Sequence, residues 1–368
     1  MDKDTPYNSD KVDHNCELND KEYREGKIEL TSYPQAIFVQ MDAPCNHDCL
    51  FCSRPEVYRH FNIDEFEAEF AHALEPVFER VRQINLTGSG ELLFHPEALR
   101  NLEYFNRFKH ARKMFATNGS SLTPKMTDFI AGSENQYLIH VSMHSSEQDL
   151  HRRMARAGTY QAVTENIRYV SSIKQQCPGL QMKLVFVATT ENIHNLPDFI
   201  RYAYEMNADG VVVYYHYVYR MDQKPISCYF KQDFTNTMLD EAEKTTEQLN
   251  RNGEKNINVS LPPRFGRPYD IPGGVCNEAW SQVMVNSSGD IISCDVAGDS
   301  YENLKDKDSF FDVWNGKYYT DLRRKLKESE FDCAKFCFRA NPNTVNELKS
   351  HVITRGKSPE ELKEFLTE

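Results

Sequence analysis

Apolar and polar positions alternate regularly between residues 34 and 215, a pattern that predicts buried strands alternating with helices. Six short apolar runs predict strands, at residues 36–41, 84–86, 113–116, 138–143, 183–188 and 210–215. Amphipathic stretches between them predict helices near residues 64–80, 96–108, 123–131, 160–173 and 196–206. Repeated strand–helix units form a parallel sheet with right-handed crossovers. Six units are too few for a closed eight-stranded barrel of about 250 residues, so we expect an open, partial α/β barrel.

After residue 230 the pattern changes and predicts a second, smaller domain. A polar helix is expected near 234–252, a strand near 257–261 and a linker rich in Pro and Gly after them. Apolar residues on both sides of 286–289 predict a β-hairpin, and 310–325 predicts a helix. We therefore expect five parts. They are a polar N-terminal arm that is flexible or loosely docked (1–33), a barrel core (34–230), a helical linker (231–270), a small cysteine-containing domain made of a β-hairpin plus a helix (271–345) and a charged helical tail (346–368).

The composition is that of an ordinary globular protein with an acidic surface. Of the 368 residues, 40% are hydrophobic and 27% are charged, and the formal net charge is −12. An acidic surface argues against a broad phosphate-binding face, so nucleic acid is not an expected partner. No apolar run approaches the roughly 20 residues of a membrane span, and the N-terminus lacks a secretory pattern. We expect a cytoplasmic protein that has no membrane partner.

Cysteines carry the main chemical signal, because the chain has 10 of them and the cytoplasm keeps thiols reduced. Cys45, Cys49 and Cys52 follow the first predicted strand with the spacing C-x3-C-x2-C. Three thiols leave a site incomplete, since structural zinc takes four protein ligands and a cluster held by four cysteines has no open iron. The alternative is a zinc loop that His47 or a distant cysteine completes.

This spacing, with the aromatic Phe51 before the last cysteine, resembles the radical S-adenosylmethionine (SAM) superfamily. The resemblance implies a (β/α)6 barrel in which the three cysteines hold a [4Fe–4S] cluster whose open iron binds the amino and carboxylate groups of SAM. It also implies a flavodoxin- or ferredoxin-type electron donor and reductive cleavage of SAM to methionine and a 5′-deoxyadenosyl radical. That radical would then remove a hydrogen atom from the substrate.

Residues after the later strands extend the resemblance, because parallel α/β folds bind ligands at the carboxyl ends of their strands. The element from Gly88 to Glu91 resembles the family's Gly-Gly-Glu, whose backbone holds the SAM amino group, with Ser89 where glycine is commoner. Two later positions resemble contacts to the ribose or carboxylate of SAM, and an arginine, Arg153 in preference to Arg156, could pair with the carboxylate. The residues implied to bind SAM are Phe51, Gly88, Ser89, Gly90, Glu91, Asn118, Ser142 and Arg153.

A second group of cysteines, Cys276, Cys294, Cys333 and Cys337, lies in the small domain. The predicted hairpin brings Cys276 near Cys294, and four thiols make a closed site for zinc or for a [4Fe–4S] cluster. The layout resembles the auxiliary-cluster domain of radical SAM proteins, called SPASM or, in its one-cluster form, twitch. The resemblance implies iron–sulfur and one auxiliary cluster, so two clusters in all. The C-x3-C spacing of Cys333 and Cys337 departs from the commoner C-x2-C.

In this family the auxiliary cluster is thought to accept an electron from the substrate radical or to shape the pocket. Oxidation, epimerisation, decarboxylation, cross-linking or another rearrangement could follow. Oxidation needs a base near the reacting carbon. The candidate catalytic residues, at and just past the end of the sixth strand, are Tyr215, His216, Tyr217 and Arg220, with Cys228 as a candidate hydrogen donor.

Three functions remain open from the sequence. The first is an enzyme that acts on a small polar substrate such as a sugar, an aminocyclitol or an amino-acid derivative. The second is a maturase that modifies a ribosomally made peptide. Because such maturases often carry an N-terminal recognition domain that residues 1–33 are too short to form, the first function is favoured. The third is a non-catalytic metal-binding or electron-transfer protein, which SAM cleavage would exclude.

Overall fold

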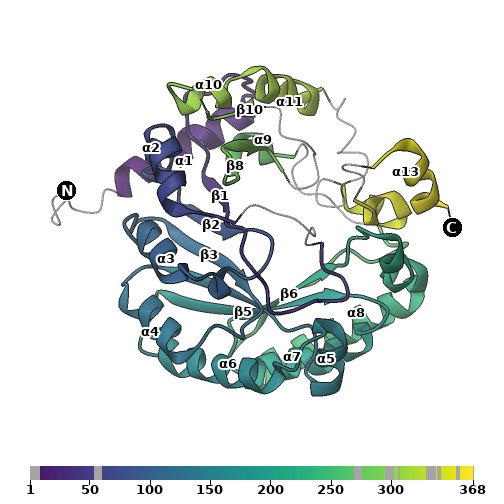
Figure 1. The fold of residues 1–368 in the computed structure, drawn as a ribbon. Coiled ribbons are helices and arrows are strands. Elements are labelled where there is room, and N and C mark those ends of the chain that lie inside the picture. Colours follow the sequence, from purple (N-terminus) through teal and green to yellow (C-terminus); the bar gives the residue numbers. More distant parts are fainter. Residues whose placement is uncertain are drawn as a thin grey trace.

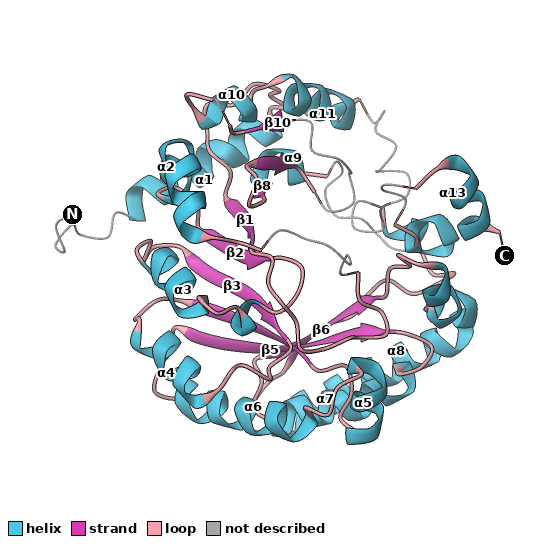
Figure 2. Ribbon diagram, in the orientation of Figure 1, coloured by secondary structure: helices cyan, strands magenta, loops and turns pink. Residues whose placement is uncertain are grey.

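The computed structural model describes residues 9–53, 60–268, 276–294, 302–305, 307–328, 337, 341–353 and 357–367. In this part of the chain one sheet, of order β10-β9-β8-β1-β2-β3-β4-β5-β6-β7, curves into an open barrel with helices on its outer side (Figures 1 and 2). The strands are β1 (Ala36–Gln40), β2 (Gln83–Thr87), β3 (Arg112–Thr117), β4 (Tyr137–Ser142), β5 (Leu180–Ala188), β6 (Gly210–Tyr215), β7 (Asn258–Ser260), β8 (Gln282–Val285), β9 (Asp290–Ile292) and β10 (Glu302–Asn303). The α-helices are α1 (Ser9–Arg24), α2 (Ile63–Phe78), α3 (Ala98–Asn106), α4 (Pro124–Gly132), α5 (Gln148–Ala155), α6 (Tyr160–Lys174), α7 (Leu196–Glu205), α8 (Gln232–Asn252), α9 (Glu278–Ser281), α10 (Phe310–Trp314), α11 (Lys317–Lys327) and α13 (Pro359–Leu366).

Strands β1 to β6 pair in parallel in chain order, which confirms the predicted open α/β barrel. Successive side chains of a strand point to opposite faces. Residues such as Ile37, Phe115 and Phe186 belong to the main hydrophobic core, on the face that the helices cover. Alternate residues such as Phe38 and Met114 face the inside of the barrel, which we call the lumen. This alternation decides which strand residues can reach a bound molecule.

Residues 231–270 do not form the expected linker. Helix α8 packs beside α7 and buries Leu239 and Ala242. The predicted strand near 257–261 is β7, and it pairs in parallel with β6, with Asn258 opposite Gly210. The region therefore extends the barrel by one more strand. Strand β7 is short and mostly exposed, so its sequence gives no sign that it continues the barrel sheet.

The small C-terminal domain shares the sheet of the barrel. Strand β8 pairs in parallel with β1, placing Val283 opposite Ile37, at the edge away from β7. The predicted hairpin is confirmed, since β8 and β9 are antiparallel and Gly289 takes a positive φ of 79° in the turn. The helix predicted over 310–325 is two helices, α10 and α11, because α10 ends at Asn315 and α11 begins after Gly316.

Helix α1 corrects the expectation of a flexible or loosely docked N-terminal arm. The buried Glu22 carboxylate accepts hydrogen bonds from the hydroxyls of Thr31, at 2.8 Å, and Ser32, at 2.6 Å. The buried Asn19 amide donates to the Trp280 carbonyl at 2.8 Å. The polar sequence suggested an exposed segment, but these polar groups are buried and paired.

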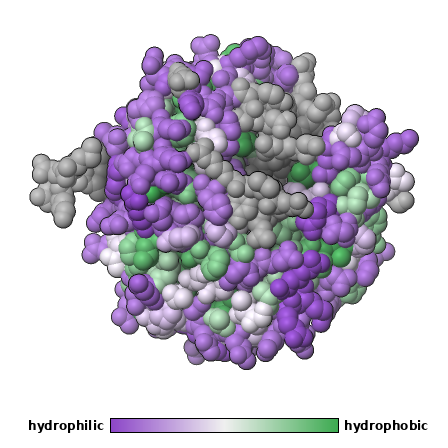
Figure 3. All heavy atoms as spheres, in the orientation of Figure 1, coloured by the Kyte–Doolittle hydropathy of each residue, from purple (hydrophilic) through white to green (hydrophobic). Residues whose placement is uncertain are grey.

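The C-terminal tail docks on the loop that follows β6. The backbone N–H of Val218 donates to the His351 carbonyl at 2.7 Å, and Val352 and Phe365 pack with Val218 in a separate hydrophobic cluster. The predicted helical tail contains α13, whose first turn is capped by Ser358. The face of the molecule in Figure 3 is mainly hydrophilic. Among the described residues, none of the helices has the length and apolar character needed to cross a membrane.

Candidate active site

The three cysteines after β1 gather in one half-buried loop. Burial, followed by the negative charges of Cys52 and Cys45, raises the pKa of Cys49 to about 12. Mutual repulsion of this kind is relieved when the thiolates bind iron. In the described residues no three His, Cys, Asp or Glu side chains converge on a single ion position. Three thiol donors fit a [4Fe–4S] cluster in which each cysteine binds its own iron and one iron has no protein ligand.

Within the loop, His47 lies against the barrel wall. Its ring is buried, Nε2 is 2.9 Å from the Thr159 hydroxyl, and the ring packs edge-on against His151 at 6.3 Å. Burial, with a smaller contribution from His151, lowers the pKa of His47 to about 4. Its contacts tie the cysteine loop to the segment between α5 and α6, which gives His47 a role other than the zinc ligand considered from the sequence.

Helix α5, which the sequence pattern did not predict, supports the same loop. The N–H groups of Asp48 and Leu50 donate to the carbonyls of Ala155, at 3.3 Å, and Met154, at 2.9 Å. Arg156, which ends α5 with a φ of 48°, reaches Asp48 at 3.5 Å. Arg153 is exposed on α5. The structure therefore places Arg156, and not the preferred Arg153, in contact with the cysteine loop, while a role for either in SAM binding stays a prediction.

The glycine-containing element after β2 is joined to the backbone that leads into Cys45. The Ala43 N–H donates to the Ser89 carbonyl at 2.9 Å, and the Ser89 N–H donates to the Asp42 carboxylate at 2.6 Å. Gly90 has a φ of 97°, and a Cβ there would lie 1.7 Å from the Ala43 oxygen. Glycine is required at this position by the approach of the cysteine loop itself.

Glu91 and Asn118 connect the ends of β2 and β3 to that loop. The buried Glu91 carboxylate accepts hydrogen bonds from the Thr117 hydroxyl at 2.7 Å and the Asn118 N–H at 2.5 Å, and burial raises its pKa. The Asn118 amide donates to the Asn46 side chain at 2.9 Å and lies 3.9 Å from the Cys45 sulfur. Glu91 thus acts as an internal support. The predicted SAM contacts of Gly88, Ser89, Glu91, Asn118 and the half-buried Ser142 stay predictions.

Phe51 lies among side chains from the ends of β4 and β6. Its ring packs edge-on against His144, with centroids 4.6 Å apart, and lies 6.3 Å from the ring of His216. Burial lowers the pKa of His144 to about 3, and its Nδ1 accepts a hydrogen bond from the Val187 N–H at 3.1 Å. His216 is also buried. The predicted aromatic contact of Phe51 with SAM would therefore form beside two neutral imidazoles.

Two of the predicted catalytic residues point away from the lumen. Tyr215 is buried on the helix-facing side of β6, and its hydroxyl donates to the Pro263 carbonyl at 2.8 Å. Cys228 is buried in the main core, where burial raises the pKa of its thiol to about 12. Tyr214, one residue earlier, faces the lumen instead. Side chains alternate between the two faces of β6, and Val211, Val213 and Tyr215 belong to the core. This alternation predicts that Tyr214 faces the lumen. Tyr217 is half-buried beyond the end of the strand.

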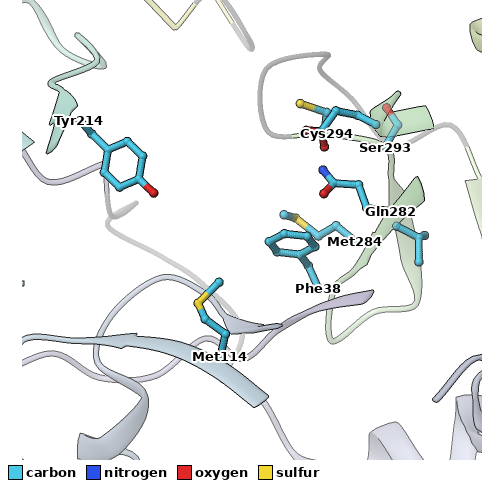
Figure 4. Close-up of a pocket in the computed structure, with 9 residues that line it drawn as sticks. Phe38, Met114, Tyr214, Gln282, Met284, Ser293 and Cys294 are labelled. Atoms are coloured by element: carbon cyan, nitrogen blue, oxygen red, sulfur yellow. The ribbon is translucent and has the colours of Figure 1, made fainter. Parts of the chain in front are cut away.

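A cavity of about 300 Å³ lies between the lumen and the small domain. Figure 4 shows Tyr214 pointing into it from the side opposite Phe38, Met284 and Cys294. Its residues are Phe38, Met114, Tyr214, Glu278, Gln282, Val283, Met284, Ser293 and Cys294. The lining is mainly apolar, with polar groups from the small domain. A cysteine expected to hold the auxiliary cluster therefore borders the cavity.

The auxiliary cysteines gather within the small domain. Burial, followed by the negative charges of Glu278, Cys294 and Cys337, raises the pKa of Cys276 to about 12. Cys276 precedes α9 and Cys294 follows β9, so the hairpin brings them together as predicted. Cys333, the fourth predicted ligand, lies outside the described residues. Together with Cys333, the three described thiols would supply the four cysteine donors of a closed cluster.

One support of the cysteine loop was missed by sequence reasoning. Gln223, in the loop after β6, is buried, and its side-chain amide donates to the carbonyls of Cys52 at 3.0 Å and Leu50 at 3.4 Å. Its oxygen accepts hydrogen bonds from the N–H groups of Tyr219 and Arg220. The Arg220 guanidinium also donates to the Cys52 carbonyl, at 2.9 Å. No periodic pattern in the sequence reveals a contact between residues 171 positions apart.

We expect Gln223→Leu to weaken retention of the cluster about 10- to 100-fold, as loss of a residue that orients a metal ligand commonly does. Leucine keeps the buried volume but removes both donors to the cysteine loop. The measurement is iron content against chelator concentration, with the EPR spectrum of the reduced cluster. Gln248→Leu, on the exposed surface of α8, is the control. Equal iron retention in the two variants would show that Gln223 does not orient the loop.

Comparison with known proteins agrees with this geometry. The family model of the radical SAM superfamily matches residues 44–203, which include the cysteine loop and the ends of β2 to β5. This part of the chain is a radical SAM domain. A second family model, the iron–sulfur cluster-binding SPASM domain, matches residues 276–339, which contain all four auxiliary cysteines. The cofactors of this radical SAM protein are accordingly [4Fe–4S] clusters and SAM.

Curated relatives are distant. The uS12 methylthiotransferase RimO of Clostridium novyi is 20% identical over 259 residues, covering 66% of this chain and 56% of the relative. RimO of Caldanaerobacter subterraneus is 24% identical over 188 residues, covering 47% and 42%. The chain thus matches only about half the length of these relatives.

Solved structures share the fold over most of the chain. Streptococcus suis SuiB has a TM-score of 0.63 at 15% identity, covering 88% of this chain and 76% of SuiB. SuiB bound to its precursor peptide SuiA has a TM-score of 0.60 at 15% identity, covering 88% and 75%. The protein anSMEcpe with bound AdoMet has a TM-score of 0.61 at 14% identity, covering 90% and 96%. At such identities these matches establish a common fold alone.

Proposed function

We propose that the protein abstracts a hydrogen atom from a side chain of a peptide or protein substrate. The observation that carries the proposal is the cavity of about 300 Å³ between the lumen and Cys294. Its volume is at the lower end of the range for small-ligand pockets, so it suits one side chain or a very small molecule. Two proteins of the same fold, SuiB and anSMEcpe, have been crystallised with peptides.

The residues of this chain have separate tasks in the proposed reaction. Cys45, Cys49 and Cys52 hold one cluster, and Cys276, Cys294, Cys333 and Cys337 hold the other. When bound, the first cluster and SAM supply a 5′-deoxyadenosyl radical, with the electron coming from a flavodoxin- or ferredoxin-type donor. The cavity walls, Phe38, Met284 and Tyr214 among them, position the substrate carbon and exclude water from it. Cys294 borders the cavity, which supports a role for the auxiliary cluster as acceptor of an electron from the substrate.

A small polar metabolite, the substrate favoured by the sequence, is the second candidate. The polar groups of Gln282, Ser293 and Glu278 on one side of the cavity are suited to hydroxyl or amino groups of such a molecule. Oxidation, epimerisation and rearrangement are all compatible with either substrate class. We place the reaction in the cytoplasm, where an iron–sulfur protein has reduced thiols and an electron donor.

Transfer of deuterium tests the proposal. Cells are grown in deuterated medium, and their extract is divided by ultrafiltration into low-mass and high-mass fractions. Each fraction is added to the reconstituted protein with unlabelled SAM and a reductant, and 5′-deoxyadenosine is analysed by mass spectrometry. We expect deuterated 5′-deoxyadenosine from the high-mass fraction or from its peptide component. Protease treatment of that fraction should abolish the transfer of deuterium.

The other outcomes separate the alternatives. Deuterium from the low-mass fraction that survives protease treatment would assign a metabolite substrate. Absence of any 5′-deoxyadenosine from protein that carries its full iron content would contradict the enzymatic function and favour a metal-binding or electron-transfer role.

A further inference from the structure

The lumen of the barrel has an unusual charge distribution. Strands β1 to β6 contain no aspartate or glutamate, although the chain has 55 acidic residues and a net charge of −12. Two cationic side chains, Arg112 and Lys183, face the lumen at positions where closed barrels carry packed branched apolar residues. Within the described residues neither cation forms an ion pair, and an unpaired basic group favours a negative charge supplied by a ligand.

Lys183 and His140 are the centre of this arrangement, and we call them the lumen pair. Lys183 lies between Met182 and Leu184, which are core residues, so its side chain points into the lumen. It is opposite His140 in the β4–β5 register. Side chains opposite each other on neighbouring strands point to the same face with their Cβ atoms about 5 Å apart. The two side chains are therefore neighbours.

Neither side chain of the lumen pair has all its hydrogen-bonding groups paired within the described part of the chain. Lys183 makes no ion pair or hydrogen bond there, and the buried Nε2 of His140 has no hydrogen-bond partner. Burial, followed by the positive charges of Lys183 and Arg112, lowers the pKa of His140 to about 4, so the ring is neutral at physiological pH. A buried polar atom left without a partner is costly, which favours a ligand or water at this place.

The register also leaves room beside the pair. The residue next to His140 on β3 is Ala116, and the residue next to Lys183 on β6 is Gly210. Ala116 is small and exposed, so the row across the sheet is open on the β3 side of the pair, whereas on the β6 side a Cβ at Gly210 would lie 2.5 Å from the Asn258 carbonyl oxygen. On β2, the fully buried Asn85 has a side-chain NH2 that finds no partner among the described residues, and its register neighbours Phe38 and Met114 line the cavity.

We propose that the lumen pair binds a carboxylate of the substrate. One ammonium and one neutral imidazole offer a positive charge and N–H donors to the two acceptor oxygens of a carboxylate. The inference rests on the function proposed above and narrows it: the substrate carries an acidic group that enters the lumen beyond the cavity. The group is a glutamate or aspartate side chain if the substrate is a peptide, or the carboxylate of a free acid.

Binding to the oxidised holoenzyme tests this proposal without any turnover. The probes are N-acetylglutamate N-methylamide, its glutamine counterpart, succinate and inorganic phosphate, and the measurement is anaerobic calorimetry. We expect the glutamate probe to bind at least about tenfold more tightly than the glutamine probe, because its hydrogen bonds are charge-assisted. Lys183→Met should abolish this difference, and Lys183→Arg should keep it within about threefold. Lys244→Met, a surface lysine paired with Glu241, is the matched control.

The arms of the experiment identify the source of the carboxylate. Tighter binding of the glutamate probe than of succinate supports an acidic side chain in a peptide, and the reverse supports a free acid. Equal or undetectable binding of the glutamate and glutamine probes, tighter binding of phosphate, or a preference that survives Lys183→Met with normal iron content would each overturn the proposal. If deuterium is transferred from a metabolite and carboxylates bind in a Lys183-dependent way, the substrate is not a peptide. The proposal that the lumen pair binds a carboxylate would then still hold.

Discussion

Replacing Cys45, Cys49 and Cys52 together by alanine should lower the iron content from about eight to about four per chain and abolish SAM cleavage. The three thiols lie in one loop, and the raised pKa of Cys49 shows that burial and the neighbouring charges disfavour its thiolate until iron binds. The auxiliary cysteines lie in a different part of the sheet, beside β8 and β9, and should keep their cluster. Iron and sulfide analysis after anaerobic reconstitution, with chromatography of 5′-deoxyadenosine, measures both effects.

Cys177→Ala is the control for this triple variant, because Cys177 stands alone and half-buried before β5. It should keep both the iron and the cleavage. If the unmodified protein instead holds about four irons that fall to none in the triple variant, with zinc present, the small domain is structural. In that case the protein would have no auxiliary cluster to accept an electron from the substrate.

Strong local patterns explain why the barrel could be predicted from the sequence. Each strand of the core is an apolar run bounded by polar turns, and Cys45, Cys49 and Cys52 lie within a short segment after β1. The parity of β6 was equally available, since Val211, Val213 and Tyr215 alternate with Val212 and Tyr214. The place of Tyr215 at the strand end suggests a catalytic role, whereas the alternation assigns its side chain to the core.

Other features depend on contacts that no local pattern contains. Gln223 and α5 both hold the cysteine loop through hydrogen bonds to its backbone, which any sequence can offer. Helix α1 is polar because its buried groups, such as Glu22, bond to backbone and hydroxyl groups of the chain that follows. The pairing of β8 with β1 joins residues about 250 positions apart, and only the assembled sheet shows that the small domain extends the barrel.

Gly90→Ala should destabilise the protein by about 3 kcal/mol or more and prevent SAM binding, because two effects combine at this residue. Its φ of 97° is strained for any residue with a Cβ, and that Cβ would lie 1.7 Å from the Ala43 oxygen. The backbone must therefore move. The Ala43 segment cannot yield independently, since it is bonded to Ser89 and leads within two residues into Cys45. The strain is transmitted to the first cluster ligand, so iron retention should fall together with the free energy of unfolding.

Gly132→Ala separates this effect from the general consequence of replacing a glycine. Gly132 ends α4 with an ordinary φ, and no heavy atom lies within 4 Å of the position its Cβ would take. Its stability should change by less than about 1 kcal/mol, with SAM binding and iron content retained. Denaturant unfolding and equilibrium dialysis of SAM measure the two variants side by side. Normal SAM binding by Gly90→Ala would mean that the element after β2 can move without displacing the cysteine loop, and that the two do not form one rigid unit.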